Sequence, residues 1–404
     1  MTTAAMSMTH PRTAPVLERA TVVLLLCFVA SLQISIAAAN ILLALMMVCW
    51  VGQMAQEKTR PGAPPFFWPL AAYAVVTLVI SAFSLDPRTS FIDDKQLLLF
   101  VIVPAVYQIA RGDRAALAID VIVSVGAASA AYGIIQYGLL HYDNLGRRPE
   151  GAMSHYMTYS GLLMLVICAA AARLIFGRRG RLWPALVMPA LVVALALTLG
   201  RSAWIGASVA IALLLALKDL RLTVLLPIFI AMLFVIAPNT VSKRVMSIFD
   251  VQEPTNQDRL AMIEIGARIV HDHPLTGVGP NMVPRVYAQY RPDYAINTVN
   301  PHLHNVPLQI AAERGLLALA VWLWFIVFLL VEHARLFRKA ISSDDKVPAA
   351  AALAAVAAML AAGLFEYNFG DSEFLMLFLV LVTLPFAAAR SGMGPDHATG
   401  AARR

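Results

Sequence analysis

The sequence is short of charge and of cysteine. Only 14% of its residues are Asp, Glu, Lys or Arg, whereas 60% are hydrophobic. A soluble protein of this size carries roughly a quarter charged residues, so the composition excludes an ordinary soluble domain. Cys27, Cys49 and Cys168 all lie inside apolar runs, and the sequence has no CxxC pair. This excludes a disulfide framework and a cysteine metal site, and we expect the three thiols to be packing residues.

What the chain does have is a series of apolar runs of about 17–25 residues, enough to cross a bilayer core roughly 30 Å thick. The runs do not alternate with polar residues, which argues against strands. The segment Met1 to Arg19 is polar, and the first apolar run follows it without an A-x-A-like signal-peptidase site. This predicts a retained signal-anchor. The sequence therefore predicts an all-α polytopic membrane protein with about twelve transmembrane helices, at residues 19–36, 38–55, 66–84, 96–110, 116–140, 156–176, 183–200, 203–217, 222–238, 315–334, 348–366 and 372–389.

Basic residues predict the orientation. One set of loops, including both terminal segments, holds 19 Lys and Arg, and the short loops of the other set hold five. Because basic residues in short loops stay in the cytoplasm, both termini are predicted to be cytoplasmic. The other seven lie in one long outer segment. The predicted organisation is thus 1–238 with nine spans, a large outer loop at 239–314 that contains short helices, and 315–404 with three spans and a short cytoplasmic tail.

Three outer segments carry arginines at the ends of spans or helices: "NLGRRPEGAMSHYMTYSG" with Arg147, Arg148 and His155, "LTLGRSAWIG" with Arg201, and "NQDRLAMIEIGARIVHDHPLTGVGPN" with Arg259. Arg201 interrupts two apolar runs, and an ionised group so close to hydrocarbon is costly unless it is paired, which makes it a functional candidate. The alternative is that these side chains reach toward lipid headgroups. Arginine suits phosphate because its planar fork binds two oxygens and stays charged. Several arginines at one membrane face therefore predict a site for a lipid diphosphate.

Two helices are expected in and after the long outer segment. The first has one apolar face and ends near Pro274, with the face formed by Leu260, Ile263, Ala267 and Val270. The second follows "NPHLHN", where Asn305 is the expected N-cap and Pro307 fits the first turn. His304 would then share a helical face with Gly315, about three turns away. A helix N-terminus favours a neutral imidazole and attracts phosphate, so His304 is a candidate base beside an anionic substrate, the alternative being a simple capping residue.

These residues resemble a known family. His304-Asn305 followed after nine residues by Gly315-Leu316 is similar to the H-[NSQ]-x9-G-L signature of bacterial O-antigen ligases, the WaaL family of the O-antigen ligase/polymerase superfamily. "GRSAWIG" resembles the family's arginine-centred motif, and "DRLAMIEIGARIVHDHPLTGVGPN" its outer-loop segment. The resemblance covers residues 145 to 335, and the twelve-span layout extends it to the whole chain.

The resemblance implies a glycosyltransferase with a GT-C-like helical fold in the bacterial inner membrane, with its active site facing the periplasm. The donor would be a glycan on undecaprenyl diphosphate, and the acceptor the core sugar of lipid A–core oligosaccharide, in lipopolysaccharide biosynthesis. Arg201 and Arg259 would hold the diphosphate, and His304 would take the acceptor proton. Arg147, Arg148, Asn305 and His155 would bind substrate. Besides these substrates the partners would be membrane lipids, and no nucleic acid is expected.

No cofactor, metal or ATP is expected, and a single displacement would invert the anomeric configuration. The strongest argument against the expected absence of a metal is the adjacent acidic pair Asp93–Asp94 in an outer loop, since carboxylates can bind a metal ion. The main alternative is another enzyme of the superfamily, an O-antigen polymerase or a protein O-oligosaccharyltransferase; the short C-terminal tail favours the ligase over the latter. A lipid-linked-glycan transporter would instead predict basic residues along a central cavity and paired broken spans.

Overall fold

The computed structural model describes residues 14–392, and in this range the regular secondary structure is helical, apart from one isolated bridge between Asn144 and Arg147. The all-α prediction is confirmed for these residues. The first part of the predicted signal-anchor segment, with Arg12, and the end of the predicted tail, with Arg403 and Arg404, lie outside the described residues.

Six of the described helices are long and apolar enough to cross a membrane: α2 (Ile36–Glu57), α6 (Asp113–Gly138), α7 (Tyr156–Phe176), α9 (Arg201–Lys218), α14 (Val306–Lys339) and α15 (Lys346–Gly363). The chain is therefore a multi-pass membrane protein. Other helices occupy the remaining predicted spans: α1 (Ala14–Ser31), α3 (Phe67–Ala82), η1 with α5 (Asp94–Val101 and Ile102–Ile109), α8 (Leu182–Leu197), η2 with α10 (Leu220–Val224 and Leu225–Ile236) and α16 (Ser372–Ala388). The count of twelve spans stays a prediction.

Helices α7 and α15 form the centre of the bundle. In each, 78% of the apolar stretch is buried by other parts of the protein, compared with 22% in α2. Small residues allow this close packing. Gly206 of α9 lies so near its neighbours that a Cβ would collide with Met164 of α7 and lie 2.8 Å from the carbonyl oxygen of Ala358 in α15. The packing fixes the N-terminal ends of α7 and α9 and the C-terminal end of α15 beside one another.

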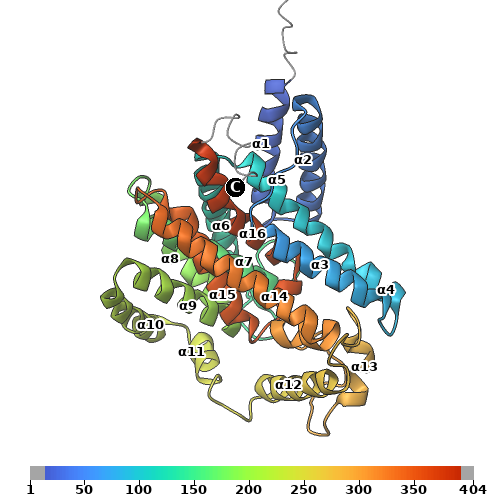
Figure 1. The fold of residues 1–404 in the computed structure, drawn as a ribbon. Helices are drawn as coiled ribbons and strands as arrows, with labels where there is room; N and C mark the ends of the chain where they lie inside the picture. Colours follow the sequence, from blue (N-terminus) through green and yellow to red (C-terminus); the bar gives the residue numbers. More distant parts are fainter. Residues whose placement is uncertain (1–13, 393–404) are drawn as a thin grey trace, which may run out of the picture.

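The predicted outer loop, 239–314, folds into α11 (Asn239–Met246), α12 (Pro254–Asp272), α13 (Val283–Tyr290) and the first turns of α14. Figure 1 shows α11 to α13 at the end of the molecule opposite the start of α1 and the end of α16. Short helices complete the fold: α4 (Pro87–Asp93), η3 (Asn368–Gly370) and η4 (Ala389–Gly392).

Helix α12 forms as predicted, but its buried face was predicted wrongly. Leu260 and Ile263 are 50% and 48% exposed, whereas Ala261, Met262 and Ile265 are buried against α13 and the start of α14. Both sets of residues have helical spacing, so periodicity alone could not choose between them. Packing against α13 and α14 determines which face is buried, and it leaves Leu260 and Ile263 at the wall of a cavity.

Helix α14 is broken, which corrects the prediction that His304 and Gly315 share one continuous helical face. Gly315 has φ 74° and ψ 173°, and His304 precedes the helix with φ 48°. The loop at 274–279 pairs with the broken segment: the N–H of Val278 donates to the carbonyl of Ala312 (3.0 Å), and that of Leu316 to Pro274 (2.8 Å). The close approach at Gly315 is thus made by a loop rather than by the expected second helix.

The span predicted at 348–366 ends earlier than expected. Helix α15 ends at Gly363, so Glu366 lies in the connection to α16 and not inside a membrane helix. Since His304 precedes the N-cap of α14, His304 and Glu366 lie on two neighbouring non-helical segments.

Candidate active site

His304 faces a carboxylate. Its Nδ1 lies 2.9 Å from Oε1 of Glu366, and the two side chains are only 16% and 14% exposed. His304 is held immediately before the N-cap of α14 in the left-handed region, a conformation that is strained for a residue with a Cβ and is found at functional sites. Glu366 was not among the predicted site residues.

The ionisation of Glu366 determines the tautomer of His304. Burial opposes the charge of this carboxyl, but the hydrogen bond from His304 and the charges of both neighbouring histidines lower its pKa. An ionised carboxylate can only accept, so the Nδ1–H of His304 donates to it. The Nε2 of a neutral His304 then keeps its lone pair and can accept a proton, as in catalytic His–carboxylate pairs.

His302 completes this group. Its ring centre lies 4.2 Å from that of His304, and its Nδ1 is buried with no hydrogen-bond partner among the described residues. Burial lowers the pKa of His302 to about 4, and repulsion from the charge of His304 adds to the shift. His302 is therefore neutral near pH 7.

Arg201 lies at the start of α9, directly after the turn at Gly200, and is 4% exposed. Its Nη1 donates to the carbonyl oxygen (3.1 Å) and the hydroxyl (3.2 Å) of Ser247. Its Nη2 lies 3.5 Å from Glu253, which also pairs with Arg244 at 2.8 Å. Arg244 and Glu253 were not predicted. They link α9 to the helices of the outer segment, with two arginines sharing one carboxylate.

Arg259, on α12, has no hydrogen bond or ion pair with any described residue. Burial lowers the pKa of its guanidinium; the negative charge of Glu366 opposes this shift, and the positive charge of Arg244 adds to it. A half-buried cation without a partner is unfavourable and indicates a place for an anion.

The structure separates the predicted pair Arg147 and Arg148. Arg148 lies 4.1 Å over the ring of Tyr156, and burial, together with the charge of Arg244, lowers the pKa of its guanidinium. It therefore belongs to the same electrostatic cluster as Arg201 and Arg259. Arg147 is exposed and lies 4.1 Å over the ring of Tyr142, outside that cluster.

The other two predicted substrate-binding residues are helix caps. Asn305 is the N-cap of α14, as expected, and its Nδ2 also donates to the carbonyl of Leu364 (3.0 Å). Both ends of its amide are therefore used within the protein. His155 caps α7 by accepting from the N–H of Met157 (3.2 Å), and it remains exposed at the rim of the site.

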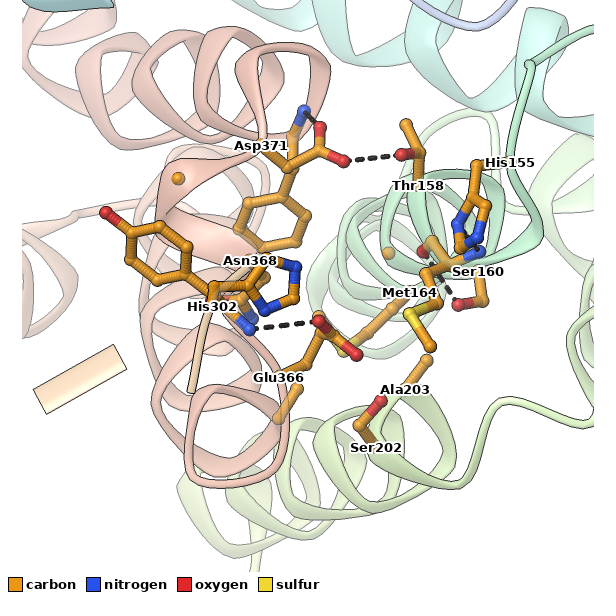
Figure 2. Close-up of a pocket in the computed structure, with 16 residues that line it drawn as sticks. His155, Thr158, Ser160, Met164, Ser202, Ala203, His302, Glu366, Asn368 and Asp371 are labelled. Atoms are coloured by element: carbon orange, nitrogen blue, oxygen red, sulfur yellow. Dashed lines mark hydrogen bonds between the residues drawn. The ribbon is translucent and has the colours of Figure 1, made fainter. Parts of the chain in front are cut away.

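Two cavities meet at these residues. The first, here the polar cavity, has a volume of about 340 Å³ and is lined by His155, Thr158, His302, Glu366, Asn368 and Asp371, among others. Figure 2 shows these side chains converging from the start of α7, from the segment before α14 and from the connection before α16. The second, here the arginine cavity, has a volume of about 280 Å³ and contains Arg201, Arg259 and His304 beside an apolar wall. Ser202 lines both cavities.

One group of described residues has the chemistry of a metal site. The nearest ligand atoms of His302, His304 and Glu366 lie within 4.8 Å of one another. Two His and one Glu can bind zinc, but ligand atoms around a tetrahedral zinc are about 3.3 Å apart for bonds of roughly 2.0 Å. The 2.9 Å between His304 and Glu366 fits a hydrogen bond better. Asp93, from the acidic pair considered earlier, lies 3.6 Å from Arg314 instead.

Part of the chain that contributes to these cavities is similar to a known family. Residues 185–323 match a family model described as O-antigen ligase, which confirms the resemblance to that superfamily. The matched segment runs from α8 into α14 and includes Arg201, Arg259 and His304, but not Arg148 or Glu366. No curated protein matches the chain.

Proposed function

We propose that this protein, which matches an O-antigen ligase model over residues 185–323, transfers O-antigen polysaccharide from undecaprenyl diphosphate to lipid A–core oligosaccharide, at the periplasmic face of the inner membrane. The observation that carries the proposal is the His304–Glu366 pair next to an arginine without a partner, Arg259, in a cavity with an apolar wall. A base and an anion site side by side are what glycosyl transfer from a diphosphate requires.

The donor would lie in the arginine cavity. Arg201 and Arg259 provide cationic donors for the two phosphates, and Ile205, Phe249, Leu260 and Ile263 provide an apolar wall for the isoprenoid chain. The guanidinium groups stabilise the negative charge that develops as the diphosphate leaves. Arg244 would keep the site cationic, because it shares Glu253 with Arg201.

His304 would act as the base. The acceptor hydroxyl attacks the anomeric carbon, the new C–O bond forms, and the bond from that carbon to the diphosphate oxygen breaks. The hydroxyl proton passes to Nε2 of His304, and undecaprenyl diphosphate leaves with the bonding electron pair. Glu366 positions the imidazole and stabilises the imidazolium that results. Direct displacement inverts the anomeric configuration.

A gel-shift assay tests the function. Protein purified in detergent is mixed with undecaprenyl-diphosphate glycan and lipid A–core, with EDTA and without nucleotide, and wild type is compared with His304→Ala. We expect joined product from wild type and none from the variant. Joined product from both would remove His304 from the chemistry. Longer lipid-linked glycan, in place of joined product, would favour a polymerase of the same superfamily.

A further inference from the structure

The polar cavity contains buried atoms that have no partner. Nδ1 of His302, Oε2 of Glu366 and Oδ1 of Asn368 are buried side-chain atoms without a hydrogen-bond partner among the described residues, and all three belong to residues that line this cavity. Buried polar atoms in proteins are normally paired, so three unpaired ones around a single cavity indicate a ligand that pairs with them. The carboxylate and amide oxygens accept hydrogen bonds, so this ligand must carry donors.

The remaining lining gives the chemical class of that ligand. Met164, Ala203 and Phe374 add apolar surface to the same cavity, with Gly161 allowing Phe374 to come close. Among the described residues, no lysine or arginine lines the cavity, in contrast to the arginine cavity next to it. An apolar surface with hydrogen-bond acceptors at its edge suits an uncharged ring that has C–H faces and hydroxyl edges. The volume of about 340 Å³ is at the small end of the roughly 300–1,000 Å³ that is usual for ligand pockets, so it fits a terminal sugar rather than a long glycan.

We propose that the polar cavity is a sugar subsite that holds the acceptor sugar whose hydroxyl attacks the donor. This inference rests on the proposed function and assigns one cavity to each substrate. The donor's diphosphate lies with the arginines, and in an inverting displacement the nucleophile approaches the anomeric carbon from the side opposite the leaving group. The polar cavity adjoins the arginine cavity at Ser202 and at the contact between His304 and Glu366, so a sugar in it would have its hydroxyls next to the proposed base and the donor site.

Two substitutions remove polar atoms from this cavity without changing its shape much. His302→Phe removes the unpaired nitrogen and keeps a ring against His304 and Tyr367. Thr158→Val removes a hydroxyl that donates to Asp371 at 2.5 Å and is otherwise isosteric. Matched controls are His271→Phe and Thr298→Val, which are exposed and outside both cavities. Thermal unfolding of each full-length variant in detergent shows whether it is folded.

The measurement is binding without turnover. The probes are lipid-free core oligosaccharide for the acceptor, sugar-free undecaprenyl diphosphate for the donor lipid, and undecaprenyl-diphosphate glycan for the donor sugar. Each substitution in the polar cavity should weaken core-oligosaccharide binding by about tenfold: His302→Phe removes a hydrogen-bond partner of the sugar in a buried site, and Thr158→Val removes the hydroxyl that positions the Asp371 carboxylate in the cavity. It should leave the affinity for both undecaprenyl probes unchanged. Arg259→Gln should instead weaken the binding of both undecaprenyl probes and leave the affinity for core oligosaccharide unchanged.

Each other outcome has a defined meaning. Folded variants that bind core oligosaccharide normally overturn the subsite, and variants that weaken only the donor glycan assign the cavity to the donor sugar and overturn the acceptor assignment. Stoichiometric Zn²⁺ binding by wild type that is lost in His302→Phe, without loss of oligosaccharide affinity, would make it a metal site instead. The ligation assay is scored separately: a wild type that binds core oligosaccharide as predicted but does not ligate refutes the proposed function and not the subsite.

Discussion

At the scale of single residues, the site is organised by charges that lack complete partners. Arg259 has no hydrogen bond or ion pair with a described residue, and Glu253 is shared between Arg201 and Arg244. In a folded protein such an arrangement is unfavourable without an anion. The same residues are therefore expected to favour substrate binding and to lower the stability of the free protein.

Arg259→Met tests this relation. We expect the rate of ligation to fall by about 100-fold, because one cationic contact to the leaving diphosphate is lost. The thermal midpoint should stay the same or rise, because a half-buried charge without a partner is removed. The control is Arg268→Met on the same helix, where the side chain is exposed and pairs with Glu264. A loss of stability in Arg259→Met alone would show that Arg259 is a structural residue.

The pH dependence of stability tests His302. As pH falls, an unfolded histidine takes up a proton near its ordinary pKa of about 6.5, whereas the native pKa of His302 is lowered to about 4. Between these values the unfolded state binds the extra proton, so this group lowers stability as pH falls. The thermal midpoint of wild type should therefore fall more steeply from pH 7 to 5 than that of His302→Phe. Parallel slopes would contradict the buried neutral imidazole.

Sequence alone indicated Arg201 because it interrupts two apolar runs. It indicated Arg259 and His304 because they lie near the starts of expected outer helices and in motifs that resemble those of O-antigen ligases. It did not indicate Glu366, because an alanine-rich run carried the predicted span through residue 366, whereas α15 ends at Gly363. Arg244 could not be distinguished from a solvated loop residue, since its pairing with Glu253 exists only once α11 and α12 are folded. Residues whose role depends on tertiary neighbours were the ones that sequence could not identify.

At the scale of elements, the main irregularity is the break in α14 at Gly315. The loop at 274–279 hydrogen-bonds to the interrupted backbone around Gly315 and so holds the first turns of α14, which follow His304, against the outer segment. The segment Pro274–Gly279 and Gly315 therefore meet in one contact. Both segments could be read from the sequence, but the contact between them could not. It uses backbone groups around Gly315 that would be bonded within the helix if α14 were continuous.

Gly315→Ala should destabilise the protein by about 1–3 kcal/mol or more, because a residue with a Cβ is strained at this positive φ and the added carbon would collide with the backbone of Leu275. Gly138→Ala is the matched control, since a Cβ there meets nothing within 4 Å. Thermal unfolding in detergent measures both. Equal midpoints for the two variants would mean that the break in α14 is not needed for folding.

At the scale of the whole molecule, the candidate site lies at the end of the bundle that carries α11 to α13 (Figure 1), and the proposed function requires two substrates that are both membrane lipids. The start of α1 and the end of α16 lie at the other end, where Glu18 pairs with Arg114 at 2.5 Å and Arg390 donates to the carbonyl of Tyr107 at 3.2 Å (Figure 1). The positive charge of the predicted cytoplasmic loops indicates which end faces the cytoplasm. The site would then face the periplasm.

Single-cysteine labelling tests this orientation, after replacement of Cys27, Cys49 and Cys168. A membrane-impermeant maleimide, given access to the periplasm but not the cytoplasm, should label Thr298→Cys and spare Ile341→Cys; both positions are exposed. Ile341→Cys should react only after the inner membrane is opened. The reverse pattern would place the site in the cytoplasm and exclude a periplasmic ligation reaction.

The most direct test of the central claim is the structure of the product. Ligated glycan made by the purified wild type from undecaprenyl-diphosphate glycan and lipid A–core can be analysed by NMR for the new linkage and its anomeric configuration. The proposed mechanism has His304 as the base and a diphosphate held by Arg201 and Arg259 as the leaving group. It predicts a bond to the core sugar with inverted anomeric configuration. Retained configuration, or a new bond only between lipid-linked glycans, would contradict the account.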